Sequence, residues 1–564
     1  MTNGGKAVEA GGKRGGGWVV GLCIVVVLVV AGIALGVELP SPLRSRQGVD
    51  APLVDGSASD RATVGQDAVG EQPAPAGTVR VGVGDDLQQA VDDNAPGTTY
   101  VFAAGIHREL QVVPNDGDRF VGEPGAILSG ARDVSAGVVD WVAERGAWYV
   151  EGQQQEGMQR GKIAEGGNQL DRRPEELFSD DRRLEHVASV DELQPGRWHF
   201  DYAGDRIWVG ENPTTLGLLE TSVSPDSISG ERSPVRDVVV ENLVIEKYAS
   251  PAQLGAIGGH SAYGWSLNGV TVHDNHGGGV RIGPGMTVSA SQISGNGQIG
   301  LVGSGADEDT GETAAVVVRG NEISNNLVLD FDPAWEGGGT KFSRMYSGLL
   351  VENNWVHDNA GNALWVDIEN YDVTLRSNLV EDNGWKGIFY EISYGPHPEH
   401  GGGPTRIYWN ELRNNGFEAP NEAQAPALMV SNSEQVEVFE NVLHGNAGGI
   451  LLRESSERVP HVVDVVVRSN DVSFGSGLHG IFFHGSYDDA AMADYAADAA
   501  VVFAGNEYQV SASARFAWAG DTGDRDFWRE MVGEEGLPAG ATSQAGLARG
   551  AVEFSRSDYG ARDQ

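Results

Sequence analysis

The sequence predicts an all-β protein whose main part is a parallel β-helix, a solenoid in which each turn of the chain stacks on the turn before it. The first observation is a short repeat, N-x-φ-x-x-N with φ aliphatic, whose clear copies begin at Asn321, Asn354, Asn378, Asn410 and Asn441. The second is a β-rich run before each copy, and a glycine with another short apolar run after it. Short strands of constant length, joined by Asn and Gly corners and by loops of variable length, are typical of such a coil. Asparagines at equivalent corners are expected to stack and to hydrogen-bond along it.

The composition limits the classes of partner. The 564 residues carry a formal net charge of -41. A nucleic-acid partner would require an excess of Lys and Arg along a groove, so this charge excludes one. The chain has one cysteine and therefore no disulfide framework, so packing must hold the fold together.

The N-terminal part of the chain predicts a membrane anchor. Residues 18–37 carry no charge and match the ~20 residues that a transmembrane helix needs. Basic residues outnumber acidic ones in residues 1–17, so the positive-inside bias places this N-terminus in the cytoplasm and the C-terminal domain outside the cell. The alternative, a cleaved signal peptide, usually has an apolar region of ~7–15 residues and a small-x-small cleavage site, which is poorly formed here. Residues 38–78 are rich in Ala, Pro, Gly and Ser and are expected to form a flexible linker.

Several motifs carry a resemblance to a known superfamily. Residues 86–113 resemble the strand, helix and strand that open and cap its coil, and residues 122–131 resemble its first rung. The motifs EGGGTKF, LWVDIEN and GIFYEISY resemble actinobacterial-type surface and secreted members. The chain therefore resembles the single-stranded, right-handed parallel β-helix proteins of the pectin-lyase-like superfamily, with a membrane anchor added. That superfamily hosts lyases, hydrolases, epimerases and non-catalytic spikes on one scaffold.

The resemblance covers about residues 79–530, and the chain from residue 79 to residue 564 is expected to divide into four segments. The expected segments are an N-terminal cap with a helix and the first rungs at 79–131, an inserted small β subdomain at 132–222, the β-helix repeats at 223–520, and a C-terminal cap and tail at 521–564.

The runs that follow the Asn corners predict a column of polar side chains on the outside of the coil. Aligning LWVD, IFYE, LMVS, ILLR and IFFH places at one position Asp367, Glu391, Ser431, Arg453 and His484. Alternate residues of a strand face opposite ways, so Leu364, Val366 and Ile368 are expected to point into the coil. The reverse arrangement would bury acids in a narrow apolar core. Adjacent rungs lie ~4.8 Å apart, which makes the column continuous.

An apolar column is expected beside the polar one. Its members are Trp365, Phe389, Met429, Leu451 and Phe482. Exposed aromatic rings next to polar side chains suit stacking on sugars. The predicted substrate-binding residues are accordingly Trp365, Phe389, Glu369 and Ser431. The alternative for the two aromatic side chains is burial under the loops at 330–345 and 394–405.

Asp367 and Glu391 are the main candidates for catalysis. Two carboxylates directly opposite each other repel, so the pKa of one is expected to rise while that of the other stays low. Retaining glycosidases use a separation of ~5–5.5 Å between such groups, and inverting ones ~6.5–9.5 Å. The pair could instead hold Ca²⁺, the one cofactor considered, with Lys341 or Arg453 as the base for β-elimination on a uronate polymer. The predicted catalytic residues are Asp367, Glu391, Lys341, Arg453 and His484, and no other metal ligands are predicted.

The sequence thus predicts a cell-surface, carbohydrate-active protein that cleaves a polysaccharide in a groove on the coil, as a glycoside hydrolase or a polysaccharide lyase. The rival hypothesis is a non-catalytic surface protein that binds a glycan or acts as a rigid spacer. The two hypotheses differ in whether Asp367 and Glu391 stand open in a groove or are capped by cations from loops.

Overall fold

The computed structural model describes residues 77–532, apart from 232, 400, 486–491, 493–500 and 519. All of the described residues belong to one compact unit. The predicted transmembrane segment 18–37 lies outside the described residues. Within them, no helix combines the length and the apolar character needed to span a membrane.

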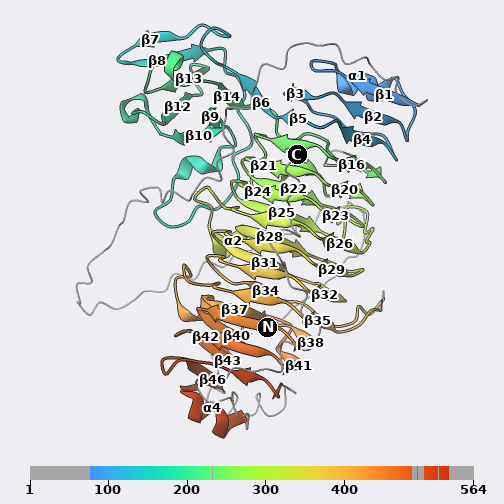
Figure 1. Cartoon of the computed structure of the whole chain (residues 1–564), viewed down its shortest axis with the longest axis vertical. Helices are drawn as coiled ribbons and strands as arrows, with labels where there is room; N and C mark the ends of the chain where they lie inside the picture. The colour runs from blue at the N-terminus through green and yellow to red at the C-terminus, as the bar shows by residue number, and fades with distance from the viewer. Residues whose placement is uncertain are drawn as a thin grey trace, which may run out of the picture. The chain divides into compact units, whose positions relative to one another are not determined.

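Three long parallel sheets form the coil, and the turns stack along its axis (Figure 1). The first sheet contains β1 (Thr78–Val81), β2 (Thr99–Phe102), β4 (Arg119–Gly122), β16 (Val239–Glu241), β20 (Ser266–Asn268), β23 (Thr287–Ser289), β26 (Val316–Arg319), β29 (Leu349–Glu352), β32 (Val373–Arg376), β35 (Thr405–Tyr408), β38 (Glu434–Phe439), β41 (Val463–Arg468) and β44 (Val502–Ala504). The second contains β3 (Gly105–Arg108), β5 (Ala126–Ser129), β17 (Val244–Glu246), β21 (Thr271–His273), β24 (Gln292–Ser294), β27 (Glu322–Ser324), β30 (Trp355–His357), β33 (Leu379–Glu381), β36 (Glu411–Arg413), β39 (Val442–Asn446), β42 (Asp471–Phe474) and β45 (Glu507–Tyr508).

The third sheet carries the runs that follow the Asn corners. It contains β18 (Gly255–Gly258), β22 (Gly278–Ile282), β25 (Ile299–Ser304), β28 (Gly338–Ser343), β31 (Asn362–Asp367), β34 (Ile388–Glu391), β37 (Pro426–Ser431), β40 (Gly448–Ser455), β43 (Leu478–His484), β46 (Arg515–Trp518) and β47 (Asp521–Gly523). A two-stranded parallel pair, β15 (Val235–Arg236) and β19 (Ala262–Tyr263), lies outside the long sheets. One continuous apolar core fills the coil from Val81 to Trp528.

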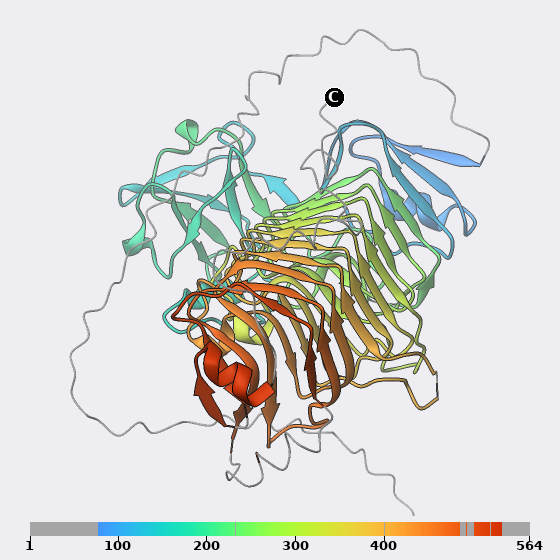
Figure 2. The ribbon, with the colours of Figure 1, turned by 60° about the horizontal axis from the view of Figure 1, so that its bottom comes forward.

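Helices close both ends of this core. At the N-terminal end, α1 (Leu87–Asp92) begins after Asp86, whose side chain accepts a hydrogen bond from the amide of Gln89, and it buries Leu87 and Val91. At the C-terminal end, α4 (Arg525–Val532) follows the antiparallel β46–β47 hairpin and buries Trp528. Figure 2 shows α4 at the open end of the coil, so its apolar side protects the last rung from solvent.

Two ladders of buried asparagines run along the corners, which confirms the predicted stacking. In the first ladder, each side-chain amide donates to the carbonyl oxygen of the next at 2.9–3.0 Å, through Asn321, Asn354, Asn378, Asn410, Asn441, Asn470 and Asn506. The second contains Asn275, Asn296, Asn326, Asn359, Asn383, Asn415 and Asn446. The same side chains also satisfy backbone groups at the turns, so the repeated asparagines have a structural cause.

Two further sheets interrupt the coil between β5 and β15. One contains β6 (Ala131–Asp133), β9 (Leu177–Ser179), β10 (Arg182–Arg183) and β14 (Leu219–Ser222). The other contains β7 (Val142–Glu144), β8 (Ala147–Glu151), β11 (Glu185–His186), β12 (Arg197–Asp201) and β13 (Arg206–Val209). These strands have their own apolar core, which includes Trp198 and Phe200.

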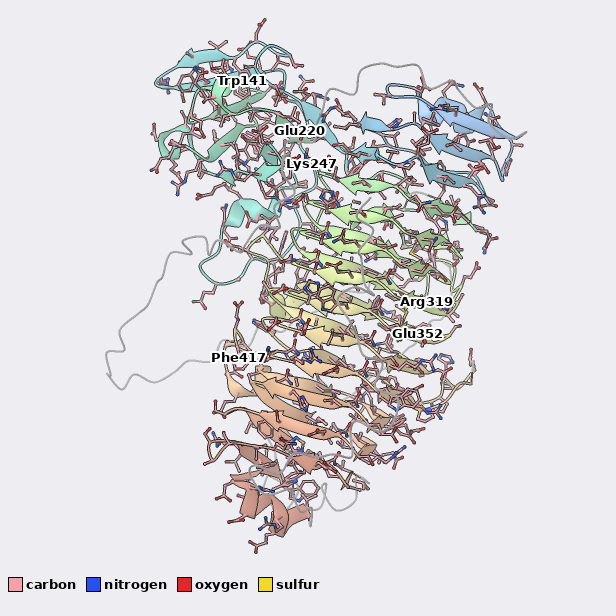
Figure 3. All side chains as sticks on the ribbon, viewed as in Figure 1. Trp141, Glu220, Lys247, Arg319, Glu352 and Phe417 are labelled. Atoms are coloured by element: carbon pink, nitrogen blue, oxygen red, sulfur yellow. The ribbon has the colours of Figure 1, made fainter. Side chains whose placement is uncertain are left out.

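A buried lysine ties the inserted strands to the coil. Lys247 follows β17, and its Nζ lies 2.5 Å from Glu220 Oε2 of β14 and 2.5 Å from Asp181 Oδ1. Lys247 and Glu220 are labelled in Figure 3. Since an unpaired buried charge would be strongly destabilising, this network orients the insert against the coil. The short helices in the loops are η1 (Gln169–Arg172), η2 (Val190–Glu192), η3 (Pro213–Thr215), α2 (Pro333–Glu336) and η4 (Glu422–Gln424).

Candidate functional site

Four of the five predicted polar residues form a column across the third sheet. The residues that pair in register on β31, β34, β37 and β40 are Asp367, Glu391, Ser431 and Arg453. All four strands are parallel, and the inward residues between them, such as Val366 and Tyr390, belong to the core. The outward polar column therefore results from simple strand alternation.

His484, the fifth predicted member, does not belong to the column. Arg453 pairs with Phe482, whereas His484 pairs with Ser455. The displacement arises because the polar side chain of His479 is fully buried, at an inward position for which the sequence alignment assumed an apolar residue. A slip of two residues keeps every side chain on the same face of a strand, so hydrophobic alternation could not reveal it.

The apolar column beside it is buried, as the alternative interpretation of its aromatic residues requires. Trp365 is 3% exposed and Phe389 5%, and they pack with Met429 and Leu451. Leu451 pairs with Gly480, so the predicted fifth member, Phe482, is displaced by the same slip. These rings therefore offer no open surface for stacking on a sugar.

Two lysines and a loop cover the aromatic rings. Lys341 Nζ lies 4.0 Å from the centre of a Trp365 ring, and Lys386 Nζ lies 4.5 Å from the centre of the Phe389 ring. Lys386 also donates a 2.5 Å hydrogen bond to Gln424 Oε1 of η4. The loop between β36 and β37, whose sequence carries no repeat motif that would indicate this role, is thus part of the cover.

Ile368 and Glu369 also depart from the predicted alternation. β31 ends at Asp367, and both following residues have left-handed backbone conformations, with φ of 61° and 57°. Ile368 is consequently absent from the described core. Glu369 accepts a 2.8 Å hydrogen bond from the hydroxyl of Tyr346 at the turn, so it is not an outward residue of the strand.

The carboxylate pair is buried and capped by cations. Asp367 is 5% exposed and Glu391 4%. Lys341 Nζ lies 3.0 Å from Asp367 Oδ2, while Arg458 Nη1 donates a 2.9 Å hydrogen bond to Glu391 Oε2. The indole Nε1 of Trp365 donates to Glu391 Oε1 at 3.1 Å. Lys341 and Trp365 were singled out from the sequence, but Arg458 lies in a loop outside the repeats and carried no periodic signal.

Burial and the neighbouring Asp367 raise the pKa of Glu391 to about 7. Arg458, Arg453 and Lys341 act in the opposite direction but do not cancel this effect. Glu391 therefore retains a proton over part of the neutral range. The predicted rise of one pKa in the pair falls on Glu391, because the low dielectric of its surroundings disfavours a second negative charge.

Buried polar atoms along the column lack hydrogen-bond partners within the described residues. They are Glu336 Oε2, Asp367 Oδ1, Ser431 Oγ and Arg453 Nε. Buried polar groups are normally satisfied, so these enclosed atoms would gain partners if a covering side chain moved and admitted a polar molecule. In the described ranges no set of three or more His, Cys, Asp or Glu residues is arranged to hold a metal ion.

A pocket of about 360 Å³ adjoins the pair on the preceding rungs. Lys341 belongs to both: it lines the pocket and contacts Asp367. The insert contributes Arg160, whose Nε and Nη2 donate to Gln253 Oε1, and Arg281 Nη1 donates to the Gln253 carbonyl oxygen. Burial, reinforced by Arg281, lowers the pKa of Arg160. Sequence patterns could not bring Arg160 and Arg281 together, because Arg160 lies in a loop of the insert and Arg281 lies on β22 of the third sheet.

Comparisons with known proteins agree with this architecture. A family model described as "Right handed beta helix region" matches residues 255–416. No curated protein matches the chain. Among solved structures, XylC in complex with xylose has 13% identity and a TM-score of 0.54, over 75% of this chain and 80% of that one. The A-module of the mannuronan C-5 epimerase AlgE4 from Azotobacter vinelandii has 10% identity and a TM-score of 0.42, over 77% and 92%. A glycoside hydrolase has 10% identity and a TM-score of 0.39, over 76% and 96%.

The stacked parallel sheets, the matching family model and the likeness to XylC agree on one architecture. The described part of the chain folds as a right-handed parallel β-helix, the architecture that the matching family model describes and that XylC shares.

Proposed function

We propose that this protein is a glycoside hydrolase that cleaves a glycan at Asp367 and Glu391 on the outer face of the third sheet. The observation that carries the proposal is the in-register pairing of these two carboxylates on adjacent rungs, with the pKa of Glu391 raised to about 7. Hydrolysis near neutral pH needs one carboxyl group that holds a proton and a second that is ionised. Glu391 suits the first role, and Asp367, ion-paired with Lys341, suits the second.

The rung spacing of ~4.8 Å is close to the ~5–5.5 Å separation used by retaining enzymes. In the proposed reaction, Asp367 attacks the anomeric carbon and forms a glycosyl ester while Glu391 gives its proton to the departing oxygen. Glu391 then takes a proton from water, and the resulting hydroxide attacks the anomeric carbon and releases Asp367. Two inversions give net retention at that carbon.

The surrounding residues suit the binding of a sugar beside the pair. Ser431 and Arg453 follow Glu391 in the column and have unpaired polar atoms that suit sugar hydroxyls. Arg458 covers Glu391, and its side chain is 42% exposed, so we propose that it moves aside when substrate binds. The pocket next to Lys341 would receive the remainder of the glycan.

The choice of sugar is a matter for experiment. XylC, which shares the fold, was solved with xylose, so xylosides are the first substrates to test here. One observation favours a different function: Lys341 and Arg458 cap the buried pair, which is the arrangement expected of a non-catalytic, glycan-binding or structural β-helix. The assay must therefore separate turnover from binding.

The test is a glycan and aryl-glycoside panel with the full-length protein, read for new reducing ends and for the absorbance of 4,5-unsaturated products. Reducing ends without unsaturated products support hydrolysis, whereas unsaturated products support elimination. The Asp367→Asn variant should lose turnover, and the Glu437→Gln variant, a surface carboxylate on the first sheet, should keep it. Binding without turnover in the wild type would favour the non-catalytic alternative.

We further propose that the protein is anchored in the cell membrane through residues 18–37, with the β-helix outside the cell. The uncharged run and the basic residues before it support this location.

A further inference from the structure

A second pocket, of about 240 Å³, lies between the inserted segment and the coil. Its walls come from η1 and β11 of the insert and from residues 328–330 of the coil. Asp171 Oδ2 accepts a 2.8 Å hydrogen bond from the amide of Asp330, and Asp330 Oδ2 accepts one of 2.8 Å from the amide of Asn168. These reciprocal bonds hold the two walls together. Its lining residues differ from those of the pocket beside Lys341.

Acidic side chains dominate this junction pocket. The carboxylates that line it belong to Asp171, Glu175, Glu176, Glu185 and Asp330. Arg173 supplies the guanidinium group among the described residues that line the pocket. Its Nη1 lies 3.2 Å from Glu156 Oε1, and its Cζ lies 3.9 Å from the centre of the Tyr202 ring. Arg173 is therefore already engaged outside the pocket. Glu176 is bonded to His276 and lies 3.7 Å from Arg183, and Glu185 accepts from Arg197. Asp171 and Asp330 have no such partner among the described residues, so they carry the negative charge that favours a positively charged ligand.

Two of the carboxylates have bonding capacity that the protein does not use. Glu175 accepts from the Gly157 amide and from the Tyr202 hydroxyl, so both of its oxygens are engaged. By contrast, Asp171 and Asp330 each use one oxygen, and their Oδ1 atoms have no hydrogen bond within the described residues. Burial raises the pKa of Asp171 to about 6, so this carboxylate is still mainly ionised at pH 7.

His186 is an independent indication of a ligand. It is 8% exposed, it lines the pocket, and its ring stacks on Trp198 at 4.2 Å. Neither ring nitrogen has a hydrogen-bond partner in the described part of the chain. Burial lowers the pKa of His186 to about 3, so the ring is neutral and keeps one acceptor nitrogen. Neither nitrogen is among the fully enclosed polar atoms that lack a partner, so the ring nitrogens of this largely buried side chain are reached from the pocket and can bond to what enters it.

We propose that the junction pocket binds the ammonium group of a small primary amine, such as an amino sugar or a basic amino acid. An ammonium group has three N–H donors. The pocket offers three matching acceptors: Oδ1 of Asp171, Oδ1 of Asp330 and the acceptor nitrogen of His186. The proposal does not depend on the reaction at Asp367 and Glu391, and a bound amine would bridge the insert and the coil.

Calorimetric titration of the full-length protein at pH 7 with glucosamine, N-acetylglucosamine and lysine tests the proposal. N-acetylation removes the charge and keeps the sugar ring, so we expect it to weaken binding at least tenfold. Binding of glucosamine but not lysine would identify an amino sugar as the ligand class, and the reverse result a basic amino acid. Binding of neither amine, or equal binding of the N-acetylated sugar, would overturn the proposal.

Two variants locate the binding to this pocket. Asp171→Asn removes the charge, and His186→Phe keeps an aromatic ring against Trp198 but removes the acceptor nitrogen. Each should weaken binding of the amine at least tenfold, whereas Asp191→Asn, an exposed carboxylate on η2, should not change it. Thermal melting checks that each variant is folded, and if Asp171→Asn unfolds, His186→Phe decides the outcome. Unchanged affinity in folded His186→Phe would contradict the site.

Discussion

Asp367 and Glu391 are paired in register on adjacent parallel strands, and each meets a different cation. Lys341 lies 3.0 Å from Asp367, and Arg458 donates to Glu391 at 2.9 Å. Lys341 belongs to the third sheet, but Arg458 belongs to a loop and is partly exposed. The cation beside Asp367 is therefore built into the coil, whereas the one beside Glu391 can leave without disturbing a strand.

Replacing Asp367 and replacing Glu391 should reduce activity in different ways, and the difference should depend on the leaving group of the substrate. An aryl glycoside has a phenolate leaving group that departs without protonation, so we expect Glu391→Gln to retain most of the wild-type rate of bond cleavage on it. On an unactivated glycan, the same variant should lose ~10²-fold or more of that rate. Asp367→Asn should lose activity on both substrates. The measurement is single-turnover release of phenol and of reducing ends. Equal losses for both variants on both substrates would argue against the assigned roles.

The raised pKa of Glu391 predicts that stability and hydrolysis both decline as the pH rises through about 7. Its pKa rises from 4.5 to about 7 on folding, so the folded protein holds a proton that the unfolded chain has lost. Stability from this group is present below pH ~4.5 and is lost as pH rises through about 7. The rate of hydrolysis should decline over the same rise in pH, because Glu391 is then ionised and cannot act as the acid. Denaturant titrations between pH 4 and 8 should show this loss in the wild type, and a smaller one in Glu391→Gln.

Replacing Arg458 should shift the pH–rate profile of hydrolysis without abolishing activity. Arg458→Ala removes a charge that lowers the pKa of Glu391, so the upper limb of the pH–rate profile should shift to higher pH. Because the Arg458 side chain is 42% exposed, the loss of stability should be only about 1 kcal/mol. Arg458→Lys should retain the wild-type profile. A large loss of melting temperature with no shift in the profile would indicate a purely structural ion pair.

The asparagine ladder should be essential to the coil. Asn378 accepts from the amide of Asn354 and donates to the carbonyls of Val351 and Asn410. Asn378→Ala leaves several buried polar groups without partners, so we expect a loss of about 3 kcal/mol in the free energy of unfolding. Asn268→Ala, at an exposed position on β20, is the matched control and should change it by less than ~0.5 kcal/mol. Similar values for both variants would mean that the ladder contributes little.

The anchor hypothesis is tested by fractionation. The full chain should sediment with membranes, and a chain that lacks residues 1–39 should be soluble and folded, because the described core of the coil begins at Val81. If the protein expressed from the full sequence is instead recovered in the soluble secreted fraction without its N-terminal residues, the result would support a cleaved signal peptide.

The sequence by itself determined the coil, its asparagine ladders and the adjacency of Asp367 and Glu391. These features depend on the alternation of strand residues and on a constant rung spacing, both of which are local properties of the backbone. A repeat motif therefore suffices to place residues of successive turns beside one another.

The tertiary structure decided what surrounds that pair. It displaced His484 by two residues, a slip that the alternation of side chains could not reveal because the strand face stays the same. It also buried Trp365 and Phe389 under side chains that include Lys386 and Gln424. Arg458 reaches Glu391 across 67 residues of sequence, and Asp330 reaches Asp171 across 159. These contacts come from loops and an insert whose lengths follow no period, so only the folded chain brings the cations and the junction pocket into place.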